Sequence, residues 1–180
     1  MKGKRVLGLL LLVALLTACK SESLEEALKT DIPFNIKKII YAEKVEGGEI
    51  VLYITEQKKE TESIEAMAVA FLKKDRKLGW ENTGNNHWYY EENPNMTVYM
   101  NVFYDYDKKG KLLQKLPVMF GKIENRQIHS IQVAKEEGRL EEAQIIHGDN
   151  SRYFFEIGDY LLVKGLNSQG EIVEEYRKRN

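Results

Sequence analysis

Three histidines are the first residues to test for acid–base or metal chemistry, because imidazole titrates near neutral pH and is a common metal ligand. His87, His129 and His147 lie far apart in the sequence. None belongs to an H-E-x-x-H pair or to a close pair with metal-ligand spacing. We therefore interpret them as surface, strand and turn residues, and expect no metal site and no cofactor.

Carboxylates occur at a suggestive spacing before Gly110. The pattern Asp105-x-Asp107-x-x-Gly110 resembles the opening of a calcium-binding loop, D-x-D-x-D-G. However, Lys109 stands at the third ligand position and Leu116 at the twelfth. A cation and an apolar side chain cannot supply the oxygen ligands that calcium needs, so this segment is predicted to be a charged turn.

Motifs for nucleophilic or phosphate chemistry are absent. The sequence has no G-x-S-x-G elbow, no G-x-x-x-x-G-K-[ST] loop and no G-x-G-x-x-G fingerprint. Adjacent glutamates such as Glu136-Glu137 and Glu141-Glu142 are expected to be solvated surface, whereas a glycosidase needs two carboxylates held across a cleft. A membrane-anchored envelope hydrolase with a carboxylate and histidine site stays open as an alternative function.

Aromatic residues are enriched in one stretch and could form a binding surface. Exposed rings suit binding to a protein, a peptide or a glycan. The alternative is that the rings fill the core, because strands favour aromatic residues. The candidate binding surface consists of Trp80, His87, Trp88, Tyr89 and Tyr90.

The N-terminal segment has the composition of an export signal. A basic start is followed by an apolar run over 6–16 and by two small residues before Cys19, the only cysteine. The apolar run is too short for a membrane-spanning helix, which needs about 20 residues. The alternative is an ordinary secretory signal whose mature chain happens to begin near a cysteine.

The residues Leu16-Thr17-Ala18-Cys19 resemble the lipobox of bacterial lipoproteins. In that family the cysteine sulfur receives a diacylglyceryl group, and the signal is then cut so that the cysteine becomes the first residue. The resemblance implies a signal peptide over 1–18, lipid attachment at Cys19, and a location on the extracytoplasmic face of the cell membrane. Two acyl chains anchor stably, because each buried methylene contributes about 0.8 kcal/mol.

Charge and cysteine content exclude some classes of protein. Loss of residues 1–18 removes three cations (Lys2, Lys4 and Arg5), so the formal net charge moves from −1 to −4. This mild negative charge argues against a nucleic-acid partner, which usually requires a basic face. With its one cysteine lipidated the mature chain has no disulfide, so the fold must depend on its core. At 43% hydrophobic and 31% charged residues, the chain is expected to be globular.

The segment 19–32 is predicted to be a tether and a short helix, with Ser23 as its N-cap. Residues 33–110 are predicted to form an α+β half in the order strand, strand, helix, strand, strand. Its first two strands surround Gly47-Gly48, which suits a tight turn. Its last two strands flank Asn93-Pro94-Asn95.

A longer helix is predicted within residues 60–77. Its apolar residues recur at helical spacing, so that they would form one stripe facing an antiparallel sheet. Acidic residues at its start and basic residues at its end would oppose the helix dipole. The stripe consists of Ile64, Met67, Ala68, Phe71 and Leu72.

Residues 111–180 are predicted to be mostly β, as a small sandwich or a meander. Short β-branched and aromatic runs alternate with turn residues, among them Gly148–Ser151, Gly158-Asp159 and Asn167–Gly170. A soft domain boundary is placed near residue 110, although the two halves could share a core.

Three stretches of this half, VMFGKIENRQIHSIQV, AQIIHGDNSRYFF and VKGLNSQGEIVEEY, resemble small lipoproteins of Bacillus-like Gram-positive bacteria. The resemblance implies an envelope location and an all-β C-terminal half, and it brings no active site. It agrees with a non-catalytic binding or interaction module held to the membrane by lipid on Cys19, with an unknown protein, peptide or glycan partner. The matching residues are Gly121, Ile123, Asn125, Arg152, Tyr153, Phe154, Gly165, Leu166, Gly170 and Ile172.

Overall fold

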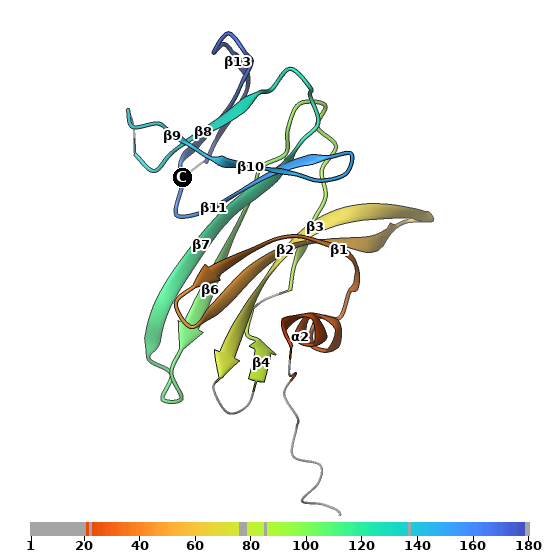
Figure 1. Ribbon diagram of the computed structural model, residues 1–180, viewed down its shortest axis with the longest axis vertical. Coiled ribbons are helices and arrows are strands. Elements are labelled where there is room, and N and C mark those ends of the chain that lie inside the picture. The colour runs from red at the N-terminus through yellow and green to blue at the C-terminus, as the bar shows by residue number, and fades with distance from the viewer. Residues whose placement is uncertain (1–20, 22, 76–78, 85, 137, 179–180) are drawn as a thin grey trace, which may run out of the picture.

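The computed structural model describes residues 21, 23–75, 79–84, 86–136 and 138–178. In these ranges, three antiparallel sheets follow one another along the long axis, and one helix lies beside the first sheet (Figure 1). This arrangement confirms the predicted fold class: an antiparallel sheet with one packed helix in the N-terminal half and a mostly β C-terminal half.

The first sheet has the strand order β1-β2-β3-β4, and β5 also pairs with β3. The predicted hairpin around Gly47-Gly48 is confirmed, since β1 and β2 pair in antiparallel register and Gly47 has a positive φ of 81°. The strands are β1 (Asn35–Val45), β2 (Gly48–Lys59), β3 (Glu62–Asp75), β4 (Gly79–Asn82) and β5 (Trp88–Tyr89).

The second sheet has the order β10-β11-β7-β6 and the third has the order β13-β12-β8-β9. The short strands predicted after residue 116 are confirmed. The second sheet contains β6 (Tyr99–Tyr106), β7 (Leu112–Ile123), β10 (Gln144–His147) and β11 (Arg152–Ile157). The third contains β8 (Ser130–Ala134), β9 (Glu141–Glu142), β12 (Leu162–Leu166) and β13 (Ile172–Arg177).

Helix α2 (Leu24–Asp31) confirms the short helix predicted near the N-terminus. The side chain of Ser23 caps it by accepting a hydrogen bond from the Glu26 amide at 3.1 Å. Ala27 and Leu28 are fully buried against the outer face of the first sheet, where they join a cluster with residues of β2 and β3. The helix therefore packs through one apolar face, as its sequence pattern indicates.

The helix predicted within residues 60–77 is wrong, because this segment forms strand β3. The run Ala66–Leu72 is apolar without interruption and is buried on both faces. Met67 and Phe71 face the second sheet, whereas Ala68 and Leu72 face helix α2. A run buried on both sides shows helical and strand spacing equally well, and the small alanines that favour a helix in isolation here make room for α2.

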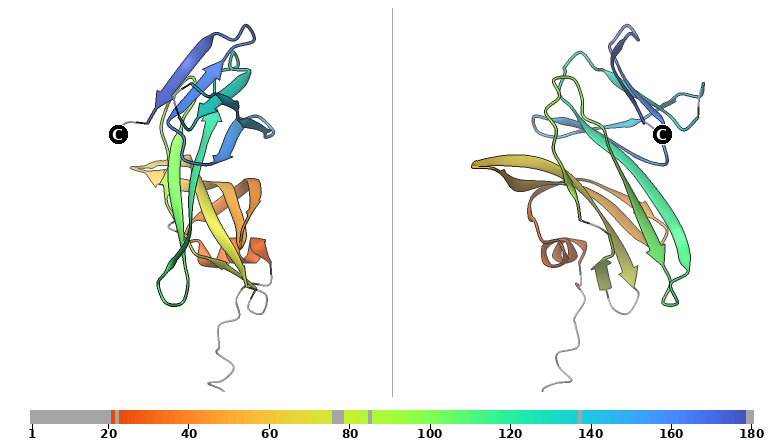
Figure 2. Two further views of the ribbon diagram at one scale, coloured as in Figure 1. Left: turned by 90° about the vertical axis from the view of Figure 1, so that its left-hand side faces the viewer. Right: turned by 180° about the vertical axis from the view of Figure 1, so that it is seen from behind.

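The middle of the second sheet is covered on both faces, and this explains its continuous apolar runs. Phe120 of β7 and Phe155 of β11 pack against the first sheet, while Met119 and Phe154, their neighbours in sequence, pack toward the third sheet. Figure 2 shows the three sheets from the side and from behind. The predicted boundary near residue 110 falls in the turn between β6 and β7, and the core between the first two sheets contains residues from both halves.

The two strands predicted around Asn93-Pro94-Asn95 exist, but they do not pair with each other. β5 pairs with β3 in the first sheet, and β6 pairs with β7 in the second. The segment between them therefore carries the chain from one sheet to the next.

Candidate functional site

The predicted aromatic surface is divided among different environments. Tyr89 belongs to the core, since its ring centroid lies 5.2 Å from that of Tyr99 and 5.5 Å from that of Phe120. Burial raises the pKa of the Tyr89 hydroxyl. Trp88, the preceding residue in this short strand, points the other way and is 39% exposed, and His87 is exposed as well.

Trp80 lies at a different place in the first sheet. It is opposite Lys74 on β3, whereas Trp88 is opposite Ala68, six positions along the same strand or about 20 Å away. The Lys74 ammonium lies 5.2 Å from the Trp80 ring centroid, which is cation–π geometry. Trp80 also packs against the cluster around helix α2. These aromatics therefore do not form one continuous patch.

Tyr90, the last residue of the predicted surface, borders a hollow between described residues. This acidic groove has a volume of about 890 Å³. Its walls come from the start of β3, from the segment that joins β5 to β6, and from the end of β7. The lining residues are Glu62, Ser63, Ile64, Glu65, Tyr90, Glu91, Glu92, Asn93, Pro94, Lys122 and Glu124.

The groove carries an excess of negative charge. Lys37 pairs with Glu65 at 3.2 Å, and Lys122 pairs with Glu124 at 2.5 Å. Within the part of the chain that the structure describes, Glu62 and Glu91 form no ion pair. The groove therefore keeps carboxylates that a cation could approach.

The Tyr90 ring is held in place at the edge of the groove. Its hydroxyl donates a hydrogen bond to Glu92 at 2.7 Å, and this bond raises the pKa of Tyr90. The Lys59 ammonium lies 5.1 Å from the ring centroid. The Tyr90 ring is therefore in cation–π contact with Lys59.

Polar side chains fix the segment that forms one wall of the groove. The Asn93 carboxamide oxygen accepts hydrogen bonds from the amides of Asn95 and Met96 at 2.8 and 3.2 Å. The Asn95 side chain in turn donates to Glu174 at 2.7 Å and accepts from Asn125 at 2.8 Å. The wall is thus tied to the third sheet and to the loop between β7 and β8.

The histidines do not converge on any of four hollows between described residues. His129 Nδ1 lies 2.8 Å from the carbonyl oxygen of Gln127, and His147 ends β10 opposite Arg152. The hollows are lined by tyrosines, glutamates and lysines, and no histidine is among their lining residues. Among the described residues, no group of three or more His, Cys, Asp or Glu side chains could hold a metal ion.

The charged turn predicted before Gly110 is confirmed as the turn of the β6–β7 hairpin. The Asp107 side chain accepts hydrogen bonds from the amides of Lys109 and Lys111, at 2.8 and 2.9 Å. Asp105 is nearly buried and pairs with Lys73 at 2.5 Å. Both carboxylates are therefore already engaged by the protein itself.

The signal peptide, the lipobox and Cys19 lie outside the described residues. The described chain begins at Ser21, which is only 8% exposed. Its carbonyl oxygen accepts a hydrogen bond from the Trp80 amide at 2.8 Å, and its hydroxyl lies 3.0 Å from that of Thr30. No described helix is long and apolar enough to cross a bilayer.

Comparison with known proteins identifies no relative of this chain. No family model matches the chain, and neither a curated protein nor a solved structure is significantly similar to it.

The groove glutamates were not among the residues that the sequence singles out. Glu91 and Glu92 directly follow the aromatic run, which is a local signal. Glu62 and Glu65 come from β3, and Glu124 directly follows β7. Only the pairing of β3 with β5 and the packing of the first two sheets bring them together. The wrong helix over 60–77 would have hidden this juxtaposition.

Proposed function

We propose that this protein is a lipid-anchored, extracytoplasmic binding module that recognises a cationic peptide segment. The observation that carries the binding role is the acidic groove beside Tyr90. It combines Glu62 and Glu91, which form no ion pair among the described residues, with an aromatic ring at its edge. Such a surface attracts lysine and arginine side chains from a distance and offers both ion pairing and cation–π contact on arrival.

The proposed location follows from the lipobox-like residues Leu16-Thr17-Ala18-Cys19 behind a basic start and an apolar run. A diacylglyceryl group on the Cys19 sulfur would hold the module at the outer face of the membrane, because two acyl chains give stable anchoring. The groove would then meet peptide segments of envelope or exported proteins.

Metabolic labelling with a fatty acid tests the anchor. We expect label and membrane association for the natural chain and neither for Cys19→Ser. Label retained by Cys19→Ser would count against attachment at this sulfur. A natural chain released into the medium without lipid would overturn the proposed location.

Titration with two labelled peptides of equal length, one rich in lysine and one rich in glutamate, tests the ligand class. We expect binding of the lysine-rich peptide only, with an affinity that falls as salt rises. The double variant Glu62→Gln, Glu91→Gln should weaken binding about threefold to tenfold, as for the loss of two partly solvated ion pairs.

A charge-matched variant provides the control. Glu136 and Glu142 are exposed residues near β8 and β9, outside the groove. The variant Glu136→Gln, Glu142→Gln has the same net charge as the groove variant and should bind like the natural chain. Equal loss in both variants would mean that overall charge, and not the groove, attracts the peptide.

A further inference from the structure

We propose that the end of the molecule at which the described chain begins, at Ser21, docks on the membrane surface through the β6–β7 hairpin. We name this end the anchor end and define it by Ser21, strand β4, the β1–β2 turn and the β6–β7 turn. The inference rests on the proposed lipid anchor and adds an orientation and a second contact with the bilayer.

The anchor end begins almost at the point of lipid attachment. Ser21 is fixed to β4 by the hydrogen bond from the Trp80 amide and to helix α2 through Thr30. Cys19 precedes Ser21 by two residues, so their Cα atoms can be no more than about 7 Å apart. A lipid on Cys19 would therefore leave no long tether, and the surface around Ser21 would lie against the head groups.

The β6–β7 hairpin belongs to the same end. Asp105 on β6 pairs with Lys73 on β3, and the Gln114 side chain on β7 donates to the carbonyl oxygen of Glu46 in the β1–β2 turn at 3.0 Å. A hollow of about 430 Å³ lies between the ends of β3 and β4 and the hairpin. Figure 1 shows the hairpin reaching down to the level of β4.

The end of this hairpin displays apolar side chains to solvent. Leu113 is 58% exposed and Tyr106 is 54% exposed. Tyr106 stacks on Tyr104 with ring centroids 6.5 Å apart, and Leu112 lies opposite Tyr106 in the register. Farther along the same sheet, Met119 and Phe154 are covered by the third sheet. The apolar surface is thus left open only where the sheet approaches the anchor end.

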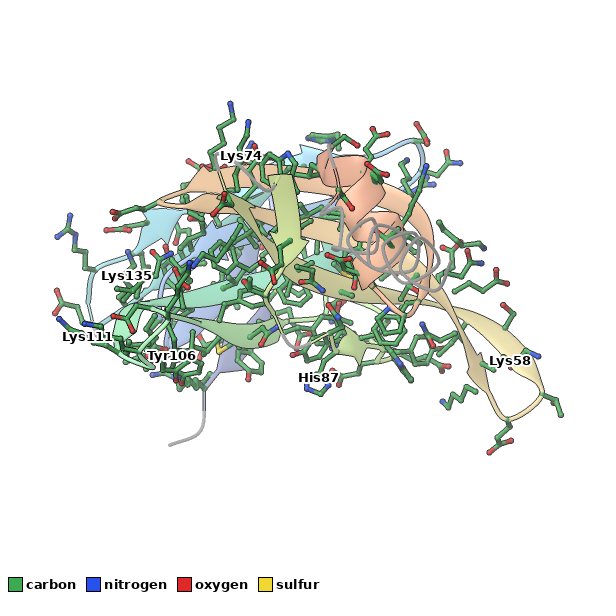
Figure 3. The ribbon with its side chains drawn as sticks, turned by 90° about the horizontal axis from the view of Figure 1, so that it is seen from below. Lys58, Lys74, His87, Tyr106, Lys111 and Lys135 are labelled. Carbon is green, nitrogen blue, oxygen red and sulfur yellow. The ribbon has the colours of Figure 1, made fainter. Side chains whose placement is uncertain are left out.

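Lysines surround this apolar surface. Lys108, Lys109 and Lys111 lie in and beside the turn, and none forms an ion pair within the described ranges. Viewed from below, Tyr106 and Lys111 lie together, well away from Lys58 at the end of the β2–β3 hairpin (Figure 3). Tyrosine and leucine flanked by lysine suit the head-group region, where rings enter the interface and ammonium groups meet lipid phosphates.

A fluorescent label on one cysteine tests the docking in the full lipidated chain. Because the chain has only Cys19, a second cysteine is the only thiol that lipidation leaves free. Leu113→Cys carries an environment-sensitive dye at the hairpin. Ile172→Cys is the matched control, since Ile172 is 53% exposed and β13 lies at the opposite end (Figure 1). Both proteins are incorporated through their lipid into vesicles that contain anionic phospholipid.

We expect the dye at position 113 to emit at shorter wavelength than at position 172, and to be quenched several-fold less by an aqueous quencher. Lys108→Glu should reduce this protection, whereas Lys58→Glu should not. Raising the ionic strength to about 1 M, where the Debye length falls to ~3 Å, should reduce it as well.

Flotation of the vesicles and the mass of the lipidated N-terminal peptide separate the two possible failures. If the chain floats with lipid on Cys19 but both dyes are equally exposed to the quencher, the docking proposal is wrong and the proposed anchor is unaffected. A chain that carries no lipid and does not float overturns the anchor and the docking together. Protection at position 113 that depends on protein density and not on anionic lipid would assign this surface to a second copy of the chain, which also overturns the docking.

Discussion

Lys73 on β3 donates a hydrogen bond to Asp105 on β6 at 2.5 Å, and this pair joins the first sheet to the second near the anchor end. Asp105 is 7% exposed, whereas the Lys73 side chain keeps contact with solvent. The carboxylate is therefore the partner whose burial depends on the pair. The hydrophobic core between the two sheets ends just beyond it, at Phe71 and Phe103.

Removal of one partner tests this contact. Lys73→Met leaves the Asp105 carboxylate buried without its cation, and we expect a loss of about 1–3 kcal/mol in the free energy of unfolding. The double variant Lys73→Met, Asp105→Leu should recover part of this loss, because no unpaired charge then remains. Urea denaturation of the four members of the mutant cycle measures the coupling. A coupling near zero would show that solvent replaces the lysine at no cost.

Tyr53 presents the opposite situation, a buried hydroxyl without a partner among the described residues. Its side chain is fully buried between β2, β3 and helix α2, and burial raises its pKa well above the usual 10.0. Because the hydroxyl forms no hydrogen bond there, Tyr53→Phe should stabilise the protein by up to about 1 kcal/mol or leave it unchanged at pH 8. A loss of more than that would reveal a partner for this hydroxyl.

The difference in free energy of unfolding between Tyr53→Phe and the natural chain should grow at alkaline pH. Tyr53 stays neutral in the folded state, whereas the unfolded chain ionises near pH 10, so ionisation favours unfolding above that pH. Ionisation of Tyr53 should leave the free energy of unfolding of the natural chain unchanged below pH 10 and lower it above that pH. At pH 11 the advantage of Tyr53→Phe should be about 1.4 kcal/mol larger than at pH 8. Urea denaturation at both pH values checks this, and a constant difference would contradict the raised pKa.

Gly121 on β7 is required because there is no room for a side chain. A Cβ atom at this position would lie 1.9 Å from the Thr97 carbonyl oxygen and 2.4 Å from the Phe154 ring. We expect Gly121→Ala to destabilise the fold by about 1–3 kcal/mol or more, since the nearest atom is backbone and cannot turn aside. Thermal unfolding measures the loss.

Gly110→Ala is a control in which the expected loss of stability has a different cause. It has open space around it but a positive φ of 79°, so Gly110→Ala should cost only about 1–2 kcal/mol through backbone strain. If Gly121→Ala cost no more than Gly110→Ala, β7 could move away from Thr97 more easily than the packing suggests.

Local signals in the sequence were enough to predict the turns, the short helix and most strands. The glycine pair at 47 and 48, the serine cap at 23 and the turn at Asn167–Gly170 each act through residues that are neighbours in the chain. Strand β3 could not be identified in this way, because its alanines favour a helix and only packing on both faces makes it a strand.

The candidate site depends on contacts between residues that are far apart in the sequence. The acidic groove joins Glu62, Glu91 and Glu124, which come from three parts of the chain. Nothing in their spacing indicates that they meet, since this follows from strand register and from the packing of two sheets. The aromatic residues were visible in the sequence, but whether each ring faces the core or solvent depends on the strand that it pairs with, as Tyr89 and Trp88 show.

Two hairpins of this fold use the same turn chemistry, which permits a matched test. Asp107 in the β6–β7 turn accepts hydrogen bonds from the amides two and four residues ahead, and Asn167 in the β12–β13 turn does the same at 3.0 and 2.9 Å. Each turn ends in a glycine with positive φ, Gly110 and Gly170. The pattern Asp/Asn-x-x-Gly thus specifies both turns through one side-chain acceptor.

Replacing that acceptor should weaken both hairpins. Asp107→Ala and Asn167→Ala each remove two hydrogen bonds from a solvated turn, and we expect each to lower the free energy of unfolding by about 1 kcal/mol. Asp107→Asn keeps an oxygen in the same position, so it should restore most of the loss at its site. Urea denaturation of the three variants measures these changes. If Asp107→Asn were as unstable as Asp107→Ala, the negative charge and not the hydrogen-bond geometry would hold the β6–β7 turn, and the likeness between the two turns would be limited to their backbone.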